Sequence, residues 1–389
     1  MGVFWSNLAS LVKQRCCGKI KKKVGAARDG HPEEEEGSDS WGLFFKLQTL
    51  EIATNFFSDS NKLGHGGFGP VYLGLLPNGE QIAVKKLSLN SRQGTKEFTN
   101  EVKLLLKIQH RNLVRLLGCC IEGPEKMLVY EYLSNKSLDY FLFDEEKRAT
   151  LDWKTRFEII NGIGRGLLYL HEESPERIIH RDIKAGNILL DEQLKPKISD
   201  FGLARLFPWD DTHVSTFRIS GTHGYMAPEY ALHGYLSAKT DVFSFGILVL
   251  EIVSGRKNHD DSLEEDKSDL LSYTWNIWQE QKALELVDPS IETRFNSEEV
   301  VKCIQLGLLC CQASIADRPE MNAVHLMLES ESFTVPKPGK PGYQGRVGRW
   351  ATYSSTTATS NTKSSEHSDS TAMTNATYSL TSSVDDYPR

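Results

Sequence analysis

Three short strings stand in one order along this chain and constrain its fold more than any other feature. They are GHGGFGPV at residues 64–71, HRDIKAGN at residues 180–187 and DFG at residues 200–202. The glycines of the first string let backbone N–H groups approach phosphate oxygens with no side chain between them. The other two strings supply carboxylate, amide and ammonium groups. Each string alone is a weak signal, but the ordered set indicates a site that handles phosphate groups.

The glycine string has two simpler interpretations. A plain glycine hairpin would account for a lone match, and a dinucleotide-binding turn would need a helix after the glycines. The residues after Gly69 are PVYL, a strand-like run, so the dinucleotide interpretation is disfavoured. We therefore interpret the string as a phosphate cradle. Its candidate nucleotide-binding residues are Gly64, His65, Gly66, Gly67, Phe68, Gly69 and Val71.

With Lys85 after the first string and APE at residues 227–229 after the last, the set resembles the eukaryotic protein kinases. The resemblance implies an α+β, bilobal fold: a small antiparallel β-sheet lobe with one helix, then a larger, mainly α-helical lobe. The patterning agrees, because strand-like segments alternate up to Tyr132 and helical patterns such as Trp153–His171 dominate afterwards. Gly164 inside that helix costs roughly 1 kcal/mol relative to alanine.

In this family a lysine at the position of Lys85 reaches the α- and β-phosphates of ATP and needs an acid to hold it. We choose Glu101, because NEV at residues 100–102 resembles the family pattern. Glu97, one turn earlier on nearly the same helix face, is the rival. Val71 and Ala83 would form the roof over the adenine. The other implied nucleotide-binding residues are Tyr130, Glu131, Leu133 and Leu189.

The same resemblance implies the chemistry. Asp182 orients the attacking hydroxyl and accepts its proton, and Lys184 lies near the γ-phosphate, where it neutralises developing charge. Asn187 and Asp200 hold Mg²⁺, with Mn²⁺ as a possible substitute, since hard oxygen ligands and ATP phosphates suit such an ion. The pattern DxKxxN resembles Ser/Thr kinases, with dual specificity left open. The implied catalytic residues are Lys85, Glu101, Asp182 and Lys184.

Several further residues have structural roles in this resemblance. His180 is packed and hydrogen-bonded and supports Phe201, and we do not expect it to act as a base or a metal ligand. Glu229 pairs with Arg318 in a buried salt bridge. Asp241 braces the backbone of the catalytic loop.

Arg181, directly before the catalytic aspartate, predicts control by phosphorylation. An arginine in this place needs an anion to balance it, and a phosphorylated loop residue supplies one. Thr216 is our first choice, because its spacing before Gly221 matches the family's phosphorylated position. Ser215 is the neighbouring candidate.

Thr222 is expected to pack under the substrate and to contact Asp182. Two nearby residues depart from the family pattern: Ser220 and His223 stand where apolar and aromatic residues are usual. These departures affect the preference for peptide substrates and leave the chemistry intact.

Further strings narrow the resemblance. LEIATNFFS at residues 50–58, QHRNLVRLLGCC at 109–120 and GYMAPEYA at 224–231 look like plant receptor-like kinases. The nearest groups are the cysteine-rich and S-domain kinases, within the larger set that includes interleukin-receptor-associated kinases. Tyr130 before Glu131 is also typical of that set. The resemblance covers about residues 46–333.

Composition divides the chain into three parts. Residues 1–45 are a basic segment followed by an acidic linker, 46–333 the kinase domain (lobes about 58–132 and 133–333), and 334–389 a disordered Ser/Thr-rich tail.

The net charge of −7 argues against a nucleic-acid partner. Seven cysteines without metal-ligand spacing indicate a reducing compartment. No apolar run reaches transmembrane length, and residues 242–253 read as a buried helix.

The sequence MGVFWS fits N-myristoylation at Gly2, Cys16 and Cys17 are candidates for palmitoylation, and the basic cluster suits anionic lipid. An ordinary basic N-terminus is the simpler alternative. The pattern predicts a receptor-like cytoplasmic kinase at the cytoplasmic face of the plasma membrane, or in the cytoplasm if it is not acylated.

The expected partners of this kinase are protein substrates and a membrane receptor kinase. The main alternative is a pseudokinase scaffold, and residues 227–229 disfavour a kinase of small molecules.

Overall fold

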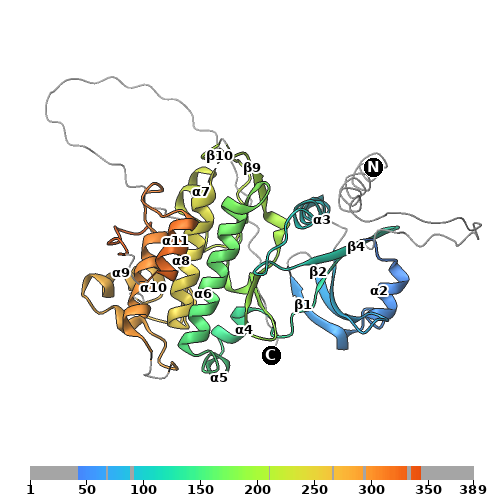
Figure 1. Ribbon diagram of the computed structural model, residues 1–389, viewed down its shortest axis with the longest axis horizontal. Helices are drawn as coiled ribbons and strands as arrows, with labels where there is room; N and C mark the ends of the chain where they lie inside the picture. Colours follow the sequence, from blue (N-terminus) through green and yellow to red (C-terminus); the bar gives the residue numbers. More distant parts are fainter. Residues whose placement is uncertain are drawn as a thin grey trace, which may run out of the picture. The chain divides into compact units, whose positions relative to one another are not determined.

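Five strands of the N-terminal part form one antiparallel sheet in the order β1-β2-β3-β5-β4 (Figure 1). The computed structural model describes residues 43–66, 69–87, 92–209, 211–264, 267–291, 295–330 and 334–342, all within the unit Met1–Tyr343. The strands are β1 (Lys62–Gly66), β2 (Gly69–Leu75), β3 (Gln81–Lys86), β4 (Leu116–Glu122) and β5 (Glu125–Glu131).

Strand β3 shows why the two faces of this sheet differ. Successive side chains of a strand point to opposite sides. Ile82 and Val84 are buried in the cluster that helix α2 (Leu47–Ala53) covers, whereas Lys85 projects from the opposite face. Helix α3 (Arg92–Leu105) packs into a separate, larger core cluster. The sheet is therefore covered by one helix and presents a lysine near the other.

The small lobe begins earlier than the predicted residue 58. The Phe45 N–H donates to the Cys119 carbonyl at 3.0 Å, and the Cys119 N–H donates to the Leu43 carbonyl at 2.8 Å. Residues 43–45 thus continue the sheet beyond edge strand β4, and α2 follows them. A strand at the edge of a sheet leaves backbone N–H and C=O groups unpaired unless another segment covers it, and residues 43–45 cover part of this edge of β4.

Helices dominate the C-terminal part (Figure 1). They are α4 (Leu138–Leu142), α5 (Glu145–Arg148), α6 (Trp153–Leu168), α7 (Pro228–His233), α8 (Ala238–Ser254), α9 (Leu270–Gln279), α10 (Ser297–Cys310) and α11 (Met321–Glu329), with shorter helical turns η1 (Asp59–Asn61), η2 (Tyr169–Glu173), η3 (Ala185–Asn187), η4 (Phe201–Leu203) and η5 (Ala283–Leu286). Two-stranded sheets pair β6 (Arg177–Ile179) with β9 (Arg205–Phe207), β7 (Ile188–Leu190) with β8 (Pro196–Ile198), and β10 (Val214–Ser215) with β11 (Tyr235–Leu236).

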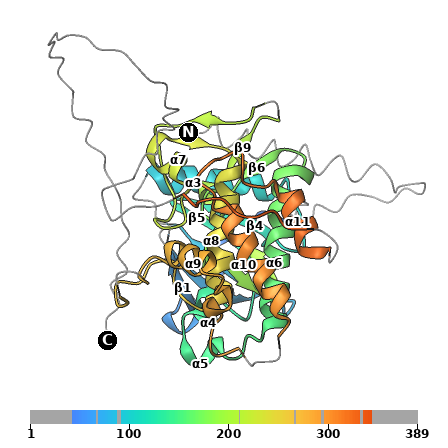
Figure 2. The same ribbon diagram turned by 90° about the vertical axis from the view of Figure 1, so that its left-hand side faces the viewer.

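Helix α8 lies between α6 and α10 at the centre of this part (Figure 1, Figure 2). Every residue from Thr240 to Ser254 is buried, as predicted for this apolar segment. A Cβ atom added at Gly246 would lie 2.7 Å from the Gly307 carbonyl oxygen of α10, so the two helices approach closely because both positions lack side chains. Among the described residues, no helix has the length and apolar character that a membrane span requires.

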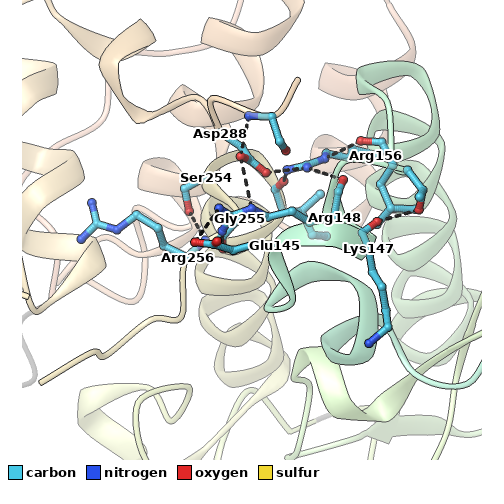
Figure 3. Close-up of polar contacts among 12 residues, drawn as sticks. Glu145, Lys147, Arg148, Arg156, Ser254, Gly255, Arg256 and Asp288 are labelled. Atoms are coloured by element: carbon cyan, nitrogen blue, oxygen red, sulfur yellow. Dashed lines mark hydrogen bonds and ion pairs between the residues drawn. The ribbon is translucent and has the colours of Figure 1, made fainter. Parts of the chain in front are cut away.

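A buried ion cluster ties α5 and α6 to the segment after η5 (Figure 3). Arg156 and Asp288 are both fully buried and lie 2.6 Å apart, and Arg148 lies 3.6 Å from the other oxygen of the same carboxylate. Arg156 also donates to the backbone carbonyls of Leu151 and Ile252. A buried guanidinium is tolerated only when it is paired and hydrogen-bonded in this way.

The predicted tail differs from the structure at its start. Residues 334–342 lie against the C-terminal helices: Gln305 of α10 donates to the Val335 and Pro336 carbonyls at 2.8 and 2.7 Å. The Ala313 N–H also donates to the carbonyl of Lys340. The Pro/Gly-rich composition resembles a linker, but side-chain and backbone donors fix these residues. Residues 343–389 lie outside the described part, as do residues 1–42.

The predicted α+β architecture with a sheet lobe and a helical lobe is confirmed. The predicted helix Trp153–His171 corresponds to α6 followed by the turn η2. Its glycines differ in their surroundings. A Cβ at Gly162 would collide with Pro196, and one at Gly166 would lie 2.8 Å from Ile198, whereas one at Gly164 would have its nearest neighbour at an ordinary 3.6 Å.

We therefore expect Gly164→Ala to raise the free energy of unfolding by up to about 1 kcal/mol, because alanine loses less conformational entropy in a helix. Gly162→Ala is the matched control on the same helix and should destabilise the protein, because its methyl group has no room. Urea unfolding of both variants measures the difference. Equal effects of the two substitutions would contradict this assignment of the packing.

Candidate functional site

Lys85 of β3 occupies the centre of the candidate site. Its ammonium nitrogen lies 3.0 Å from Glu101 Oε1 on α3 and 3.1 Å from Asp200 Oδ1 at the start of η4. Burial disfavours the charge of Lys85, but the two carboxylates outweigh it and raise the pKa of the lysine above its ordinary value. Lys85 in turn holds the pKa of Asp200 at about 2 against the opposing effect of burial. The site therefore contains one cation shared by two carboxylates.

This geometry decides between the two candidate acids on α3. Glu101 contacts Lys85, as predicted, whereas Glu97 lies beside the Asp-Phe-Gly turn. A Cβ added at Gly202 would lie 3.4 Å from both Glu97 Cβ and Glu101 Oε1, so the turn packs directly on the helix.

Tyr130 has a position that the sequence did not predict. Its hydroxyl donates a hydrogen bond to Glu101 Oε2, the oxygen that does not face Lys85. Burial and the nearby carboxylate raise the pKa of this phenol well above its ordinary value, so it stays a donor. Both oxygens of Glu101 are thus occupied.

The glycine string lies on β1 and β2, which pair Gly64 with Val71 and Gly66 with Gly69. Gly67 and Phe68 lie outside the described residues. Val71 is also the cross-strand partner of Lys85.

Three other predicted nucleotide-binding residues, Tyr130, Glu131 and Leu133, lie at or just after the end of β5. Ala83 pairs with Tyr130, and Leu133 follows the strand. The Glu131 carboxylate accepts from the Arg115 N–H at 2.8 Å and from Lys197 at 3.0 Å, so it is directed toward protein groups. His65 is exposed on β1, and Leu189 lies in β7.

The predicted catalytic loop runs from β6 to β7, and three of its polar side chains come together with Thr222, which follows β10 in the chain. Asp182 Oδ1 accepts from the Thr222 hydroxyl at 2.6 Å, and Asp182 Oδ2 accepts from Asn187 Nδ2 at 2.9 Å. Lys184 Nζ lies 2.8 Å from Thr222 Oγ1 and 3.3 Å from Asp182 Oδ2. The predicted contact between Thr222 and Asp182 is confirmed, and the loop holds a hydroxyl between a carboxylate and an ammonium group.

Asp241 of α8 supports this loop through hydrogen bonds to its backbone. Its fully buried carboxylate accepts from the His180 N–H at 2.7 Å, the Arg181 N–H at 2.8 Å and His171 Nε2 at 2.9 Å. Burial alone would raise the pKa of Asp241, but these partners, His171 above all, lower it. Arg181 has a φ of 73°, an unfavourable backbone angle for a residue with a side chain. The predicted brace is present, and it holds a strained backbone.

The predicted structural pairs are also present. The His180 ring lies edge-on to Phe201, with centroids 4.8 Å apart, and His180 Nε2 is 3.0 Å from the Ser199 carbonyl. Arg318, fully buried, makes two 2.8 Å hydrogen bonds to the Glu229 carboxylate. Two parallel bonds of this kind fix the geometry of both partners.

The donor set fits Mg²⁺. Ser199, next to Asp200, donates its N–H to the Asn187 carbonyl at 2.9 Å, so the two predicted ligands stand at the same end of the β7–β8 hairpin. Asn187 uses its amide nitrogen toward Asp182, which leaves its amide oxygen as the ligand atom. One carboxylate and one amide suit an ion that keeps water and phosphate ligands. Among the described residues, there is no group of three or more His, Cys, Asp or Glu side chains that could hold a metal ion.

The residues predicted to act in control by phosphorylation differ in the groups that they contact. The Arg181 guanidinium donates to the Leu203 and Arg218 carbonyls and to the Tyr230 hydroxyl. Thr216 follows β10, and its N–H donates to the Gly234 carbonyl at 2.9 Å. Ser215 is exposed in β10. Phosphorylation of Thr216 or Ser215 stays a prediction.

Sequence reasoning missed a buried carboxylate under the loop that follows Thr222. Glu251 of α8 accepts from the Tyr225 hydroxyl at 2.8 Å and from the Asn258 N–H at 2.8 Å. Burial nevertheless raises the pKa of Glu251 to about 8. The available signal was a carboxylate near the end of an otherwise apolar helix.

Comparisons with known proteins agree with this geometry. A family model described as protein tyrosine and serine/threonine kinase matches residues 57–328. Cysteine-rich receptor-like protein kinase 29 of Arabidopsis thaliana is 53% identical over 86% of this chain and 49% of its own length. Cysteine-rich receptor-like protein kinase 25 of the same plant is 55% identical over 76% of this chain and 44% of its own. The G-type lectin S-receptor-like serine/threonine-protein kinase RKS1 is 56% identical over 76% and 35%.

The chain therefore belongs to the protein tyrosine and serine/threonine kinase family. Within this family it groups with plant cysteine-rich and G-type lectin receptor-like kinases, which confirms the predicted resemblance. The chain spans half or less of the length of these relatives.

Glu251 generates a pH prediction. Its pKa is about 8 in the folded protein against 4.5 ordinarily, so folding favours the protonated form. Its contribution to stability is present below pH 4.5 and is lost as the pH rises to about 8, by about 1.4 kcal/mol per pKa unit. Glu251→Gln should remove this loss.

The measurement is the free energy of unfolding of the wild type minus that of Glu251→Gln between pH 5 and 9. The difference should fall across this range and level off above pH 8. Glu146→Gln, on the exposed surface of α5, is the control. A difference that does not change with pH would contradict the burial argument.

Proposed function

We propose that the chain is an ATP-dependent protein serine/threonine kinase. The observation that carries the proposal is the position of Lys85, in contact with Glu101 at 3.0 Å and with Asp200 at 3.1 Å. This cation joins the glycine-containing strands to the turn that bears the predicted metal ligand. An ammonium group in this place serves the α- and β-phosphates of ATP, and its carboxylate partner keeps it oriented.

In the proposed reaction the oxygen of a substrate hydroxyl attacks the γ-phosphorus, the bond from this phosphorus to the bridging oxygen breaks, and ADP leaves. Asp182 orients the hydroxyl and accepts its proton. Lys184 offsets the charge of the γ-phosphate. Asn187 and Asp200 would hold Mg²⁺, which neutralises phosphate charge when bound.

The surroundings of Asp182 support serine or threonine as the acceptor. The Thr222 hydroxyl, on a short side chain, already lies 2.6 Å from Asp182 and 2.8 Å from Lys184. A substrate hydroxyl of the same reach can approach the same two groups. The relative RKS1, which is named as a serine/threonine-protein kinase, agrees with this acceptor class.

We also propose that the kinase works at the cytoplasmic face of the plasma membrane, beside a receptor kinase in plant signalling. The support is the MGVFWS string, the pair Cys16 and Cys17, and six basic residues without an acid within residues 1–23. One myristoyl chain binds membranes only marginally, so a second signal is needed, and the cysteines and the basic cluster are two candidates. These residues lie outside the described part of the chain.

Asp182→Asn tests the transfer chemistry. The variant keeps the size of the side chain but loses the carboxylate, so phosphate transfer from γ-labelled ATP should fall about 100- to 10,000-fold while nucleotide binding is retained. Asp191→Asn, at the β7–β8 turn, is the matched control and should transfer normally. Equal transfer by Asp182→Asn would contradict the role of Asp182. Nucleotide binding without transfer by the wild type would favour the scaffold.

Gly2→Ala tests the membrane proposal. After coexpression with an N-myristoyltransferase, the wild type should gain one myristoyl group by mass and should sediment with phosphatidylserine vesicles. Gly2→Ala should lose both properties, because the acyl acceptor is the amine of residue 2. Gly18→Ala is the control in the same segment. Unmodified wild-type protein, or vesicle binding that Gly2→Ala retains in full, would overturn the myristoyl anchor.

A further inference from the structure

Helix α3 contacts the Asp-Phe-Gly turn through an amide side chain next to Glu101. Asn100 Nδ2 lies 3.1 Å from the Phe201 carbonyl oxygen, 3.2 Å from that of Gly202 and 2.5 Å from that of Ala204. An amide group carries two hydrogens, so three carbonyls converge on two donors. These carbonyls belong to η4 and its end. The Phe201 carbonyl also accepts the Ala204 N–H within the turn at 3.1 Å, and the amide supplies a donor to the Gly202 and Ala204 carbonyls at the end of the turn.

The helix positions two functions through adjacent residues. Consecutive side chains leave an α-helix about 100° apart. Glu101 therefore reaches Lys85 on the sheet while Asn100 reaches η4. A rigid helix that makes both contacts places the sheet lysine and the turn in one fixed relation.

The turn needs such support. Asp200 has φ 63° and ψ 73°, a left-handed conformation that residues with a Cβ rarely adopt. Strained backbone of this kind persists only where the surrounding structure fixes it. The carbonyls that Asn100 binds follow directly after Asp200 in the chain, and Lys85 fixes its carboxylate.

We propose that Asn100 is a positioning residue that makes the left-handed backbone of Asp200 depend on the position of α3. With α3 in place, the Glu101–Lys85 pair and the orientation of the Asp200 carboxylate form together. Without the amide, the turn relaxes and the carboxylate leaves its place beside Lys85. Asn100 acts through the backbone of the turn and contacts neither nucleotide nor substrate.

The test compares Asn100→Leu and Asn100→Asp, which both lose the donors, with Asn100→Gln, which keeps an amide. Gln305 is the matched control: its amide also donates to two backbone carbonyls, Val335 and Pro336, but from α10. Gln305→Glu and Gln305→Leu therefore remove the same chemistry elsewhere. The first readout is hydrogen exchange in the nucleotide-free full chain, which requires no activity.

We expect Asn100→Leu and Asn100→Asp to speed amide exchange about tenfold or more in residues 199–207 and in α3, and to leave residues 334–342 unchanged. Gln305→Glu should show the reverse pattern. Asn100→Gln should restore part of the protection. Unchanged exchange at residues 199–207 in Asn100→Leu, or equal acceleration throughout the described residues, would overturn the proposal.

The second readout rests on the proposed function and concerns Mg²⁺. Because Asp200 is the predicted ligand, Asn100→Leu should raise the Mg²⁺ concentration needed for tight ADP binding about tenfold and lower kcat more than it raises KM for ATP. Gln305→Leu should change neither value. If the wild type transfers no phosphate, the proposed function fails while exchange and ADP binding still decide the role of Asn100. An unchanged Mg²⁺ requirement in Asn100→Leu would contradict the proposal.

Discussion

The ammonium group of Lys85 is the contact on which the candidate site depends. It joins β3, α3 and the Asp-Phe-Gly turn, because Glu101 and Asp200 both bind it. These residues are far apart in sequence, and each buried charge would be costly without its partner. Folding therefore favours the arrangement in which all three groups meet, and the geometry for binding phosphate follows from that electrostatic requirement.

In the helical lobe, Asp241 is the buried charge that supports the catalytic loop. It is anchored in the buried helix α8, and its carboxylate binds the backbone of His180 and Arg181. A rigid, buried support permits an unfavourable backbone angle directly before Asp182. Each lobe thus supplies one buried charge that holds part of the site. Lys85 of the sheet lobe holds the Asp200 carboxylate, and Asp241 of the helical lobe holds the loop of Asp182.

Resemblance to the kinase family predicted several contacts between segments that are distant in sequence. The Lys85–Glu101 pair, the Glu229–Arg318 pair and the loop brace of Asp241 are what this resemblance implies, and the structure contains all three. The choice of Glu101 over Glu97 rested on resemblance, because both acids lie on nearly the same helix face. The rotation of α3 against the sheet settled it, and no local sequence signal encodes that rotation.

The sequence by itself determined the order of strands and helices, the identity of the charged groups and the family, since these depend on local spacing and composition. Only the tertiary structure decided that Tyr130 binds Glu101, that Asn100 binds the Asp200 turn and that Glu251 is buried beneath Tyr225. It also placed residues 334–342 on the helical lobe. These contacts join segments that are distant in sequence, and they arise from how buried faces pack together.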